Sequence, residues 1–430
     1  MKFFYSDTMD FVDPNYDFQT DSSKPGKEKY WDDQYAHEIL ETPPYDGLLI
    51  SMSSIRKSRN IPSGTVKYTA AEEQRLLREG ARKFLRLDLK NRNISVMGDC
   101  GAFAYASQPK PAYSPEEVCE FYLDTEIDLG VAPDHVIFEC DIDDPPESAQ
   151  SEDIRTRYEI TLSNAEHFLK LTQSEGVPFQ PLATVQGWSP ESMANAAEIL
   201  VKMGYNYLAI GGLVPLGPET IAIILNKIRT RIGNEIRVHL LGFAKADSIS
   251  KFVDFNITSF DSTSPLIRAF KDKNRNYFIE SDGAKLDYYM AVRVPQALEN
   301  PTLMQAIKRG ELNPENLSRL ERTALDALQA YEDRRVSLDE VVDKVLDYSR
   351  HMHSFLVSPS KLERELAQAR VGITRTLNDR PWERCGCSIC KALGIQVVIF
   401  RASNRNKRRG MHNLSVYHNH VKRILSEETL

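Results

Sequence analysis

A single pattern repeats along residues 47–262 and limits the possible folds more than any other feature of the chain. A short apolar run ends in glycine or a polar residue, a helical stretch follows, and the next apolar run begins. The runs are GLLISMS, ISVMGDCG, VIFECDID, LATVQGWS, YLAIGGLV, VHLLGFAK and ITSFDSTS. Val/Ile/Leu-rich runs joined by crossover helices are typical of a parallel sheet that is covered on its outside. Seven or eight such units favour an α/β fold of the (β/α)8 TIM-barrel type over an open sheet.

The segments between the apolar runs have the sequence features of helices. Several of them open with Ser-Pro or with aspartate. Serine and aspartate are favoured at the N-cap of a helix, and proline is favoured in its first turn. We therefore expect helices within 114–130, 157–176, 189–205 and 245–256.

Polar residues and glycines stand at equivalent places, where the apolar runs end. They are Asp99, Asp141, Gln186, Gly211 with Gly212, Gly242 and Asp261. The C-terminal ends of barrel strands meet on one rim, and barrels of this type build their active sites there. A turn explains any one of these residues equally well, but three aspartates and a glutamine on one rim predict a functional site.

Three parts are predicted along the chain. Residues 1–280 form the barrel core with an acidic and aromatic N-terminal extension, which we expect to be a covering surface loop. Residues 281–375 lose the strand and helix alternation and become charged and helical, which predicts a helical insertion. Residues 376–430 are predicted to form a small zinc-binding subdomain that ends in a helix.

Half of the six cysteines lie within RCGCSICKALG, at Cys385, Cys387 and Cys390. Thiolates at this spacing converge on one soft ion, and a tetrahedral site needs one more nitrogen or sulfur ligand. The next histidine is His412, at the start of an expected helix. Three cysteines with one histidine predict a structural Zn²⁺ site rather than a catalytic one. Reduced surface cysteines in a loop are the alternative.

Charge and composition restrict the class of protein. The formal net charge is -7, which argues against an extensive nucleic-acid-binding surface. The block RASNRNKRR, residues 401–409, nevertheless holds five cations. We expect this block either to contact nucleic-acid phosphates or to be a solvated loop tip.

No apolar run is long enough to cross a membrane, and the start MKFFYSDTMDF lacks the apolar region of a signal peptide. The remaining cysteines, Cys100, Cys119 and Cys140, are scattered singly, which makes a disulfide framework improbable. These features predict a cytoplasmic protein without a membrane segment.

The chain resembles the tRNA-guanine transglycosylases, a family of zinc-containing (β/α)8 barrels that replace a guanine by a 7-deazaguanine. The resemblance lies in the ordered segments MGDCGAF, CDIDDPP, VQG, AIGGL and FDS, followed by the cysteine cluster and its distant histidine. Ala102, Cys100 and Ala104 depart from the tRNA enzymes, and DSTSPLIRAFKDKNRNYF replaces their arginine-bearing segment. These departures are most like the DpdA branch, which inserts 7-deazaguanines such as 7-cyano-7-deazaguanine into DNA.

The resemblance implies a role for each matching residue. Asp261 matches the nucleophile and Asp99 the general acid and base. Asp141 and Gln186 match residues that read the guanine edge, with Asp143 as the alternative to Asp141. The family's residues that contact the base through their backbone or by packing are matched by Gly211, Gly212, Leu213 and Phe103. The zinc ligands match Cys385, Cys387, Cys390 and His412.

The expected partners are DNA and a free 7-deazaguanine base, with an ATPase or another DNA-modification protein as a further possible partner. One alternative is a tRNA-guanine transglycosylase that acts on tRNA. Another is a non-catalytic subunit of the same family, which the retention of Asp99 and Asp261 argues against. An unrelated aldolase or hydrolase barrel would need a lysine or a metal cluster at the strand ends, and the sequence offers neither.

Overall fold

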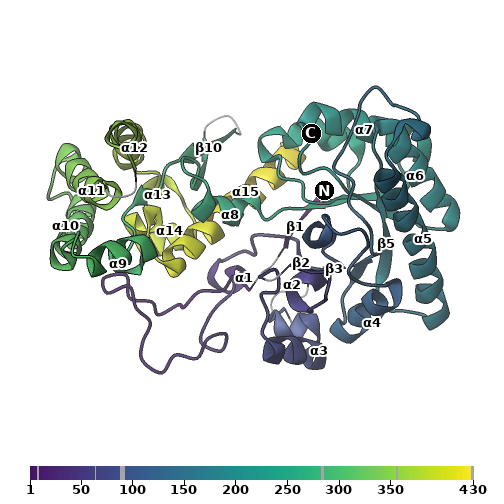
Figure 1. Ribbon diagram of the computed structural model, residues 1–430, viewed down its shortest axis with the longest axis horizontal. Coiled ribbons are helices and arrows are strands. Elements are labelled where there is room, and N and C mark those ends of the chain that lie inside the picture. The colour runs from purple at the N-terminus through teal and green to yellow at the C-terminus, as the bar shows by residue number, and fades with distance from the viewer. Residues whose placement is uncertain (7–8, 63, 88–92, 282–284, 355–356, 428–430) are drawn as a thin grey trace. The chain divides into compact units, whose positions relative to one another are not determined.

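A computed structural model describes residues 1–6, 9–62, 64–87, 93–281, 285–354 and 357–427. Eight parallel strands close into a barrel in the order of the chain, each paired with its neighbours in sequence and β1 paired with β8 (Figure 1). The strands are β1 (Lys2–Ser6), β2 (Gly47–Ser51), β3 (Ser95–Asp99), β4 (Leu129–Val131), β5 (Gln180–Val185), β6 (Tyr207–Ile210), β7 (Arg237–Leu240) and β8 (Ser259–Asp261). The predicted (β/α)8 class is confirmed.

Strand β1 closes the barrel, and the sequence reading placed no strand there. It pairs with β2 through Phe4 and Gly47 and with β8 through Phe4 and Asp261. Phe3 and Phe4 are at most 1% exposed, so the first residues of the chain belong to the core. A strand of five residues at a chain end lies outside the periodic pattern from which the other strands were predicted.

Strand β4 begins seven residues earlier than the run VIFECDID, so the prediction of a strand at 136–143 is wrong. The segment LGV is short and contains Gly130, whose Cβ would come within 2.8 Å of the Phe179 and Tyr122 rings. The later run is apolar for another reason, since Val136 and Ile137 are buried in the chain that follows the strand. The aspartate nearest to the end of β4 is therefore Asp134, three residues after the strand, and not Asp141.

One cluster of buried side chains packs inside the barrel. Each of the first five strands contributes one residue and β6 contributes two: Phe4, Leu49, Met97, Val131, Leu182, Tyr207 and Ala209. Gly47 faces the Phe4 ring so closely that an added Cβ would lie 2.1 Å from a ring carbon. The packed interior leaves the rim at the strand C-termini as the place for a site.

Local sequence signals set the helices that surround the barrel. Thr69 and Ser114 form capping boxes with glutamates three residues later, and Gly176 and Gly204 end their helices in the left-handed region. The predicted helix at 245–256 is a 3₁₀ helix, Ala246–Phe255. The helices are α2 (Met52–Ile55), α3 (Ala70–Phe84), α4 (Pro115–Thr125), α5 (Glu152–Glu175), α6 (Pro190–Met203) and α7 (Pro218–Ile232).

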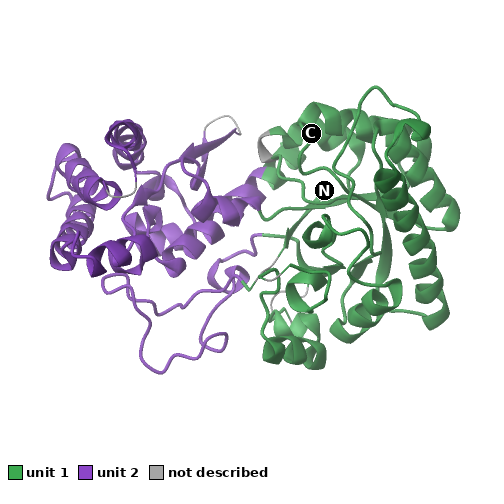
Figure 2. Cartoon of the chain, viewed as in Figure 1, with its two compact units in different colours: residues 1–9, 45–263, 421–430 green, residues 10–44, 264–420 purple. Residues whose placement is uncertain are grey.

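The contacts divide the chain into two compact units (Figure 2). The first contains residues 1–9, 45–263 and 421–430, and the second contains residues 10–44 and 264–420. Strands β9 (Tyr277–Ser281) and β10 (Lys285–Tyr289) pair antiparallel in the second unit, and β11 (Val292–Arg293) pairs with β12 (Ile399–Phe400). The three-part division at residues 280 and 375 stays a prediction.

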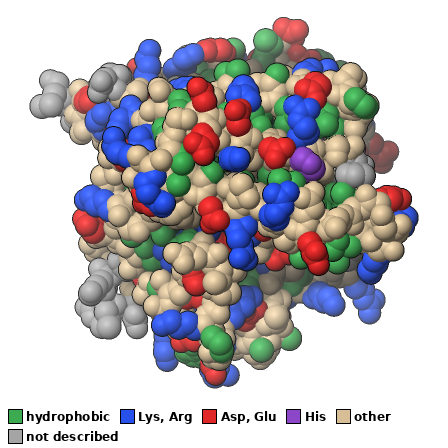
Figure 3. Space-filling model, turned by 90° about the vertical axis from the view of Figure 1, so that its left-hand side faces the viewer, with side chains coloured by type: hydrophobic (Ala, Val, Ile, Leu, Met, Phe, Trp, Pro, Cys, Tyr) green, Lys and Arg blue, Asp and Glu red, His purple; other side chains and the backbone are tan. Residues whose placement is uncertain are grey.

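The second unit is mainly helical between residues 301 and 393. Its helices are α1 (Ala36–Ile39), α8 (Ser264–Lys271), α9 (Pro301–Lys308), α10 (Pro314–Glu332), α11 (Leu338–His353), α12 (Pro359–Asp379), α13 (Pro381–Arg384), α14 (Ser388–Leu393) and most of α15 (Ser403–Glu427). Figure 3 shows acidic and basic side chains interspersed with apolar ones on one face of this unit. Arg370 of α12 and Asp343 of α11 form one such ion pair at 2.6 Å. Among the described residues, no helix combines the length and the apolar character that a membrane span requires.

Candidate active site and metal cluster

Three carboxylates follow three of the barrel strands on the same rim. Asp99 is the last residue of β3, Asp261 is the last residue of β8, and Asp134 comes three residues after β4. Their charges act on one another, because Asp261 and Asp134 both contribute to raising the pKa of Asp99. The structure thus brings the two predicted catalytic aspartates to one end of the barrel and adds a third that was not predicted.

Asp99 occupies an environment that favours its neutral form. Its Oδ1 atom is buried and has no hydrogen-bond partner among the described residues. Burial raises the pKa of Asp99 to about 7, against the opposing effect of hydrogen bonds from Ser51 and the Gly101 backbone. A carboxyl group that titrates near neutral pH can both give and take a proton.

Gly101 allows the chain to turn close to Asp99. It has a φ of 74°, in the left-handed region that favours glycine. A Cβ at this position would lie 1.9 Å from Ser53 Oγ and 2.4 Å from Ser51 Oγ. Any side chain here would displace the serine that hydrogen-bonds Asp99.

Asp261 is 7% exposed, and one of its oxygens is held by two donors. The backbone N–H of Gly242 donates to Oδ1 at 2.9 Å, and His239 Nε2 lies 3.2 Å from the same atom. An ionised carboxylate only accepts hydrogen bonds, so Nε2 carries the proton in this contact. Loop and strand residues of β7 therefore orient a carboxylate of β8.

A chain of buried hydrogen bonds continues behind His239. Ser259 Oγ lies 2.7 Å from His239 Nδ1, and Tyr207 Oη lies 2.6 Å from Ser259 Oγ. With Nε2 protonated, a neutral imidazole accepts at Nδ1, so Ser259 donates to His239 and Tyr207 donates to Ser259. Each of the three side chains is at most 3% exposed. The sequence reading missed His239, whose only signal was a histidine inside the apolar run VHLLGFAK.

Gln186 and Asp134 form the second part of the site. Gln186 Nε2 donates to Asp134 Oδ2 at 2.6 Å, and Gln186 Oε1 accepts from the Ile137 backbone at 3.2 Å. Cys100 Sγ lies 3.6 Å from Asp134 Oδ1. Burial raises the pKa of Asp134 to about 6.

Asp141 lies elsewhere, on an exposed loop. Its backbone N–H donates to the Trp188 carbonyl, and its Oδ1 accepts from the Asp143 backbone at 3.0 Å. Asp141 lines a surface pocket of about 720 Å³ together with Ile142 and Trp188. The structure therefore places neither Asp141 nor Asp143, but Asp134, in contact with Gln186.

Of the predicted base-contacting residues, the two glycines lie against Gln186 and the loop after β4. A Cβ on Gly211 would lie 2.3 Å from Gln186 Nε2, and a Cβ on Gly212 would lie 2.6 Å from the Ile137 carbonyl oxygen. Leu213 is 1% exposed. Phe103 is 66% exposed and packs edge-on against Phe138 with ring centroids 5.5 Å apart. The glycines thus permit close approach of the glutamine and the loop after β4.

Cys385, Cys387, Cys390 and His412 converge as predicted, and their ligand atoms all lie within 4.8 Å of one another. The three sulfur atoms lie 3.6, 3.4 and 3.3 Å from His412 Nδ1. Zn–S and Zn–N bonds in a tetrahedral site would separate sulfur and nitrogen by about 3.5 Å. The donor set and its spacing fit a zinc ion.

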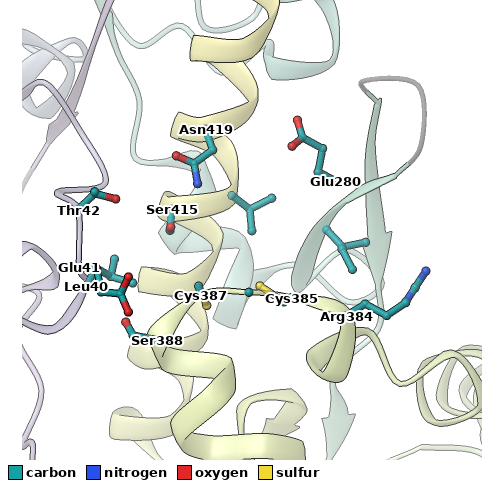
Figure 4. A pocket seen from close by; sticks show the side chains of 13 residues that line it. Leu40, Glu41, Thr42, Glu280, Arg384, Cys385, Cys387, Ser388, Ser415 and Asn419 are labelled. Carbon is teal, nitrogen blue, oxygen red and sulfur yellow. The ribbon is translucent and has the colours of Figure 1, made fainter.

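The surroundings of His412 fix its orientation. Its Nε2 lies 2.7 Å from the Phe278 carbonyl oxygen, which leaves Nδ1 for the cluster. Tyr277 stacks on the imidazole with ring centroids 4.0 Å apart. Cys385 and Cys387 border a pocket of about 320 Å³, whose lining side chains are drawn in Figure 4. The cluster thereby connects the cysteine loop, β9 and α15 within the second unit.

The basic block 401–409 is not a phosphate-binding surface, so that prediction is wrong for its arginines. Its four arginines are between 0% and 6% exposed. Arg401 and Arg405 form ion pairs with Asp21, and Arg409 donates to the backbone carbonyls of Ala269, Val397 and Ile399. These guanidinium groups fix the N-terminal part of α15 and the segments around it within the second unit.

Comparison with known proteins gives one extensive match. The chain is 39% identical over 429 residues to a protein of Salmonella montevideo described as a DNA-guanine transglycosylase. The match covers 99% of this chain and 98% of that protein. No protein-family model matches the sequence.

Proposed function

Because the chain belongs to the DNA-guanine transglycosylase family, we propose that it replaces guanine in DNA by a 7-deazaguanine such as 7-cyano-7-deazaguanine. It is a base-exchanging enzyme of the glycosyltransferase type. The main support is the match over nearly the whole chain, together with the position of Asp99 and Asp261 on one barrel rim.

In the first step, Asp261 attacks the anomeric carbon of the target deoxyguanosine. The bond from this carbon to the guanine nitrogen breaks, and a bond to Asp261 Oδ2 forms through an oxocarbenium-like transition state. Gly242 and His239 hold Oδ1, which leaves Oδ2 for the attack. Protonated Asp99 gives its proton to the departing guanine.

In the second step, the incoming 7-deazaguanine loses its ring N–H proton to ionised Asp99. Its nitrogen attacks the same sugar carbon, and Asp261 leaves as a carboxylate. Two displacements at one carbon retain its configuration. The hydrogen bonds to Oδ1 are stronger for a carboxylate than for an ester, so they stabilise the leaving group of this step.

Base recognition is assigned to Asp134 and Gln186 in place of Asp141. Asp134 can accept from the ring N–H and amino group on one edge of guanine, which 7-deazaguanines share. The contact between Gln186 and Asp134 at 2.6 Å and the burial of Asp134 support this assignment. A buried acceptor discriminates strongly between ligands that donate a hydrogen bond to it and ligands that do not.

Replacement of Asp134 by Asn is expected to lower kcat/KM for exchange by about 100-fold, since an amide donor would then face a donor of the base. Asp141→Asn is the matched control, and we expect it to change kcat/KM by less than about threefold because Asp141 is exposed. Steady-state kinetics with radiolabelled guanine would measure both. Equal effects of the two substitutions would contradict the assignment.

We assign Zn²⁺ to the cluster of Cys385, Cys387, Cys390 and His412. Bound there, the ion would stabilise the fold of the second unit and take no part in base exchange. All four ligand positions would be filled by protein atoms, so no position remains for a substrate. A cytoplasmic location stays a prediction.

The decisive experiment offers the protein 7-cyano-7-deazaguanine with duplex DNA, single-stranded DNA or tRNA, followed by nucleoside digestion and mass spectrometry. We expect the modified nucleoside in DNA and none in tRNA. Modification of tRNA alone would instead establish the tRNA enzyme. Activity on single-stranded but not duplex DNA would indicate a partner such as an ATPase that opens the duplex, because a guanine must leave the base stack to react.

The covalent intermediate needs its own measurement. Denaturation during turnover is expected to trap a protein–DNA adduct in the native enzyme, and Asp261→Asn is expected to abolish both the adduct and the exchange. Full activity of Asp261→Asn would reject the nucleophile assignment without rejecting base exchange itself.

A further inference from the structure

The barrel loops after β2 and β3 carry cations and no carboxylates. The segments 56–69 and 100–114 contain Arg56, Lys57, Arg59, Lys67 and Lys110, and neither contains Asp or Glu. The chain as a whole has more acidic than basic residues. A loop pair of one sign is therefore a local departure from the overall charge.

Hydrogen bonds join these two loops to each other. Tyr113 Oη donates to the Arg56 carbonyl at 2.6 Å, and Ser58 Oγ donates to the Ala112 carbonyl at 3.1 Å. The end of the first loop returns to α2, where the Lys67 backbone N–H donates to the Ser54 carbonyl at 2.7 Å. The loops thus form one continuous surface.

This surface adjoins the catalytic rim. The first loop follows α2, which begins directly after Ser51, and Ser51 hydrogen-bonds Asp99. The second loop begins directly after Asp99 itself. A nucleic-acid strand whose target deoxyguanosine reaches Asp99 and Asp261 would therefore have its neighbouring phosphates near these loops.

Four of the cations are exposed: Lys57, Arg59, Lys67 and Lys110. Arg56 differs, because it pairs with Glu73 at 3.2 Å and covers the Phe121 ring. We use the name basic rim for the four exposed residues. They contrast with the four arginines of the block 401–409, which are buried and hydrogen-bonded to groups of the second unit.

The loop after β4 has the opposite charge. Its exposed residues include Glu139, Asp141, Asp143 and Glu147, and two further exposed carboxylates, Glu152 and Asp153, begin α5 directly after it. A polyanion approaching the barrel mouth is attracted to the side of β2 and β3 and repelled from the side of β4. The charge distribution therefore favours a path for the strand over the side of β2 and β3.

We propose that the basic rim binds the phosphates that flank the target deoxyguanosine and sets the path of the DNA strand across the barrel. This proposal rests on the proposed function, since it takes DNA as the substrate. The phosphate contacts would offset part of the cost of unstacking the guanine, which amounts to a few kcal/mol. They would also explain DNA binding by a chain of net negative charge.

The test compares the quadruple variant K57Q/R59Q/K67Q/K110Q with the native protein in DNA-binding titrations by fluorescence anisotropy, at 50 to 200 mM salt. The slope of log affinity against log salt is negative, and each lost phosphate contact makes it less steep by about 0.9 on duplex DNA. Loss of four contacts makes it less steep by about 3.6. Between those two salt concentrations, the native protein is then expected to lose about 100-fold more affinity than the variant.

A control variant neutralises four exposed lysines on outer helices, K170Q/K202Q/K227Q/K251Q, and is expected to keep a native salt slope. An unchanged slope in the basic-rim variant would overturn the proposal, as would an equal change in the control. Thermal unfolding checks that the variants keep their fold. The single substitutions Lys57→Gln and Lys110→Gln are each expected to make the slope less steep by about 0.9. If the native protein binds DNA and exchanges its guanine, but the basic-rim variant and the control variant have the same salt slope, the basic rim is rejected. The proposed function is then unaffected.

Discussion

Asp261 receives its hydrogen bonds from two residues that precede it by 19 and 22 positions and lie on the neighbouring side of the barrel. His239 belongs to β7, and Gly242 follows this strand. The supporting Ser259 comes from β8 and Tyr207 from β6. Burial of all these groups makes each unmade hydrogen bond costly, so the arrangement is rigid. We assign His239 as a positioning residue for the nucleophile.

Replacement of His239 by Leu is expected to lower kcat by about 10- to 100-fold with KM for DNA changed less than about twofold, because Asp261 loses its orientation and not its substrate contacts. His239→Gln can keep an N–H near the Nε2 position and should recover most of the activity. Single-turnover kinetics would measure both variants, with thermal unfolding as the check on folding. If Gln rescues no better than Leu, the hydrogen bond to Asp261 has no positioning role.

The raised pKa of Asp99 predicts how stability depends on pH. The folded protein holds this proton up to pH about 7, whereas the unfolded chain releases it near pH 3.8. Between these values the folded state binds more protons, so stability falls as pH rises, and the loss is complete above pH 7.

Asp99→Asn removes this penalty and is expected to abolish exchange. The free energy of unfolding of the variant minus that of the native protein is expected to be larger at pH 8 than at pH 5, by on the order of 2 to 4 kcal/mol. Denaturant titrations of both proteins at the two pH values measure the difference. A native protein with the same pH dependence as the variant would show that Asp99 is ionised in the fold throughout this range.

At the scale of elements, α15 shows that a basic sequence can serve as core. Arg409 is fully buried, and its guanidinium satisfies three backbone carbonyls and the Asn406 side chain. Burial lowers the pKa of Arg409 to about 9, yet the group keeps its donors where the carbonyls need them. The helix is therefore positioned by polar contacts as well as by Met411 and Leu414.

Arg409→Ala is expected to destabilise the protein by about 3 to 5 kcal/mol, since several buried carbonyls lose their donor together. Lys407→Ala, on the same helix but partly exposed, is the matched control and is expected to cost less than about 1 kcal/mol. Chemical unfolding gives both values. A salt slope of DNA binding that falls in Arg409→Ala while stability is unchanged would restore the block to a role in phosphate binding.

At the scale of the whole molecule, the metal cluster and the barrel belong to different units. Zinc-finger peptides gain roughly 10 to 16 kcal/mol of apparent binding energy from such a site. His412 of α15 contacts the Phe278 carbonyl of β9, so an ion bound to the cluster would link these two elements within the second unit. Removal of the metal should therefore act on one unit.

Purified protein is expected to contain one zinc ion per chain, and chelation is expected to remove hydrogen-exchange protection from residues 277–281, 285–289 and 385–400 while β3 to β6 keep theirs. Cys387→Ser should reproduce this pattern. Elemental analysis and exchange mass spectrometry provide the two measurements. Uniform loss of protection in both units, or none, would contradict a structural role confined to the second unit.

The sequence alone determined the barrel class, six of its eight strands, the metal cluster and the rim positions of Asp99, Asp261 and Gln186. Each of these depends on local information: an apolar run, a cap, a ligand spacing, or a polar residue at a strand end. The tertiary structure decided the rest. Strand β1 exists because the barrel must close between β8 and β2, and Asp134 replaces Asp141 because packing around Gly130 sets where β4 ends. The four arginines of the block 401–409 are buried because carbonyls and Asp21, distant in sequence, surround them. Burial and partners depend on residues far along the chain, and a linear pattern of charge carries no information about them.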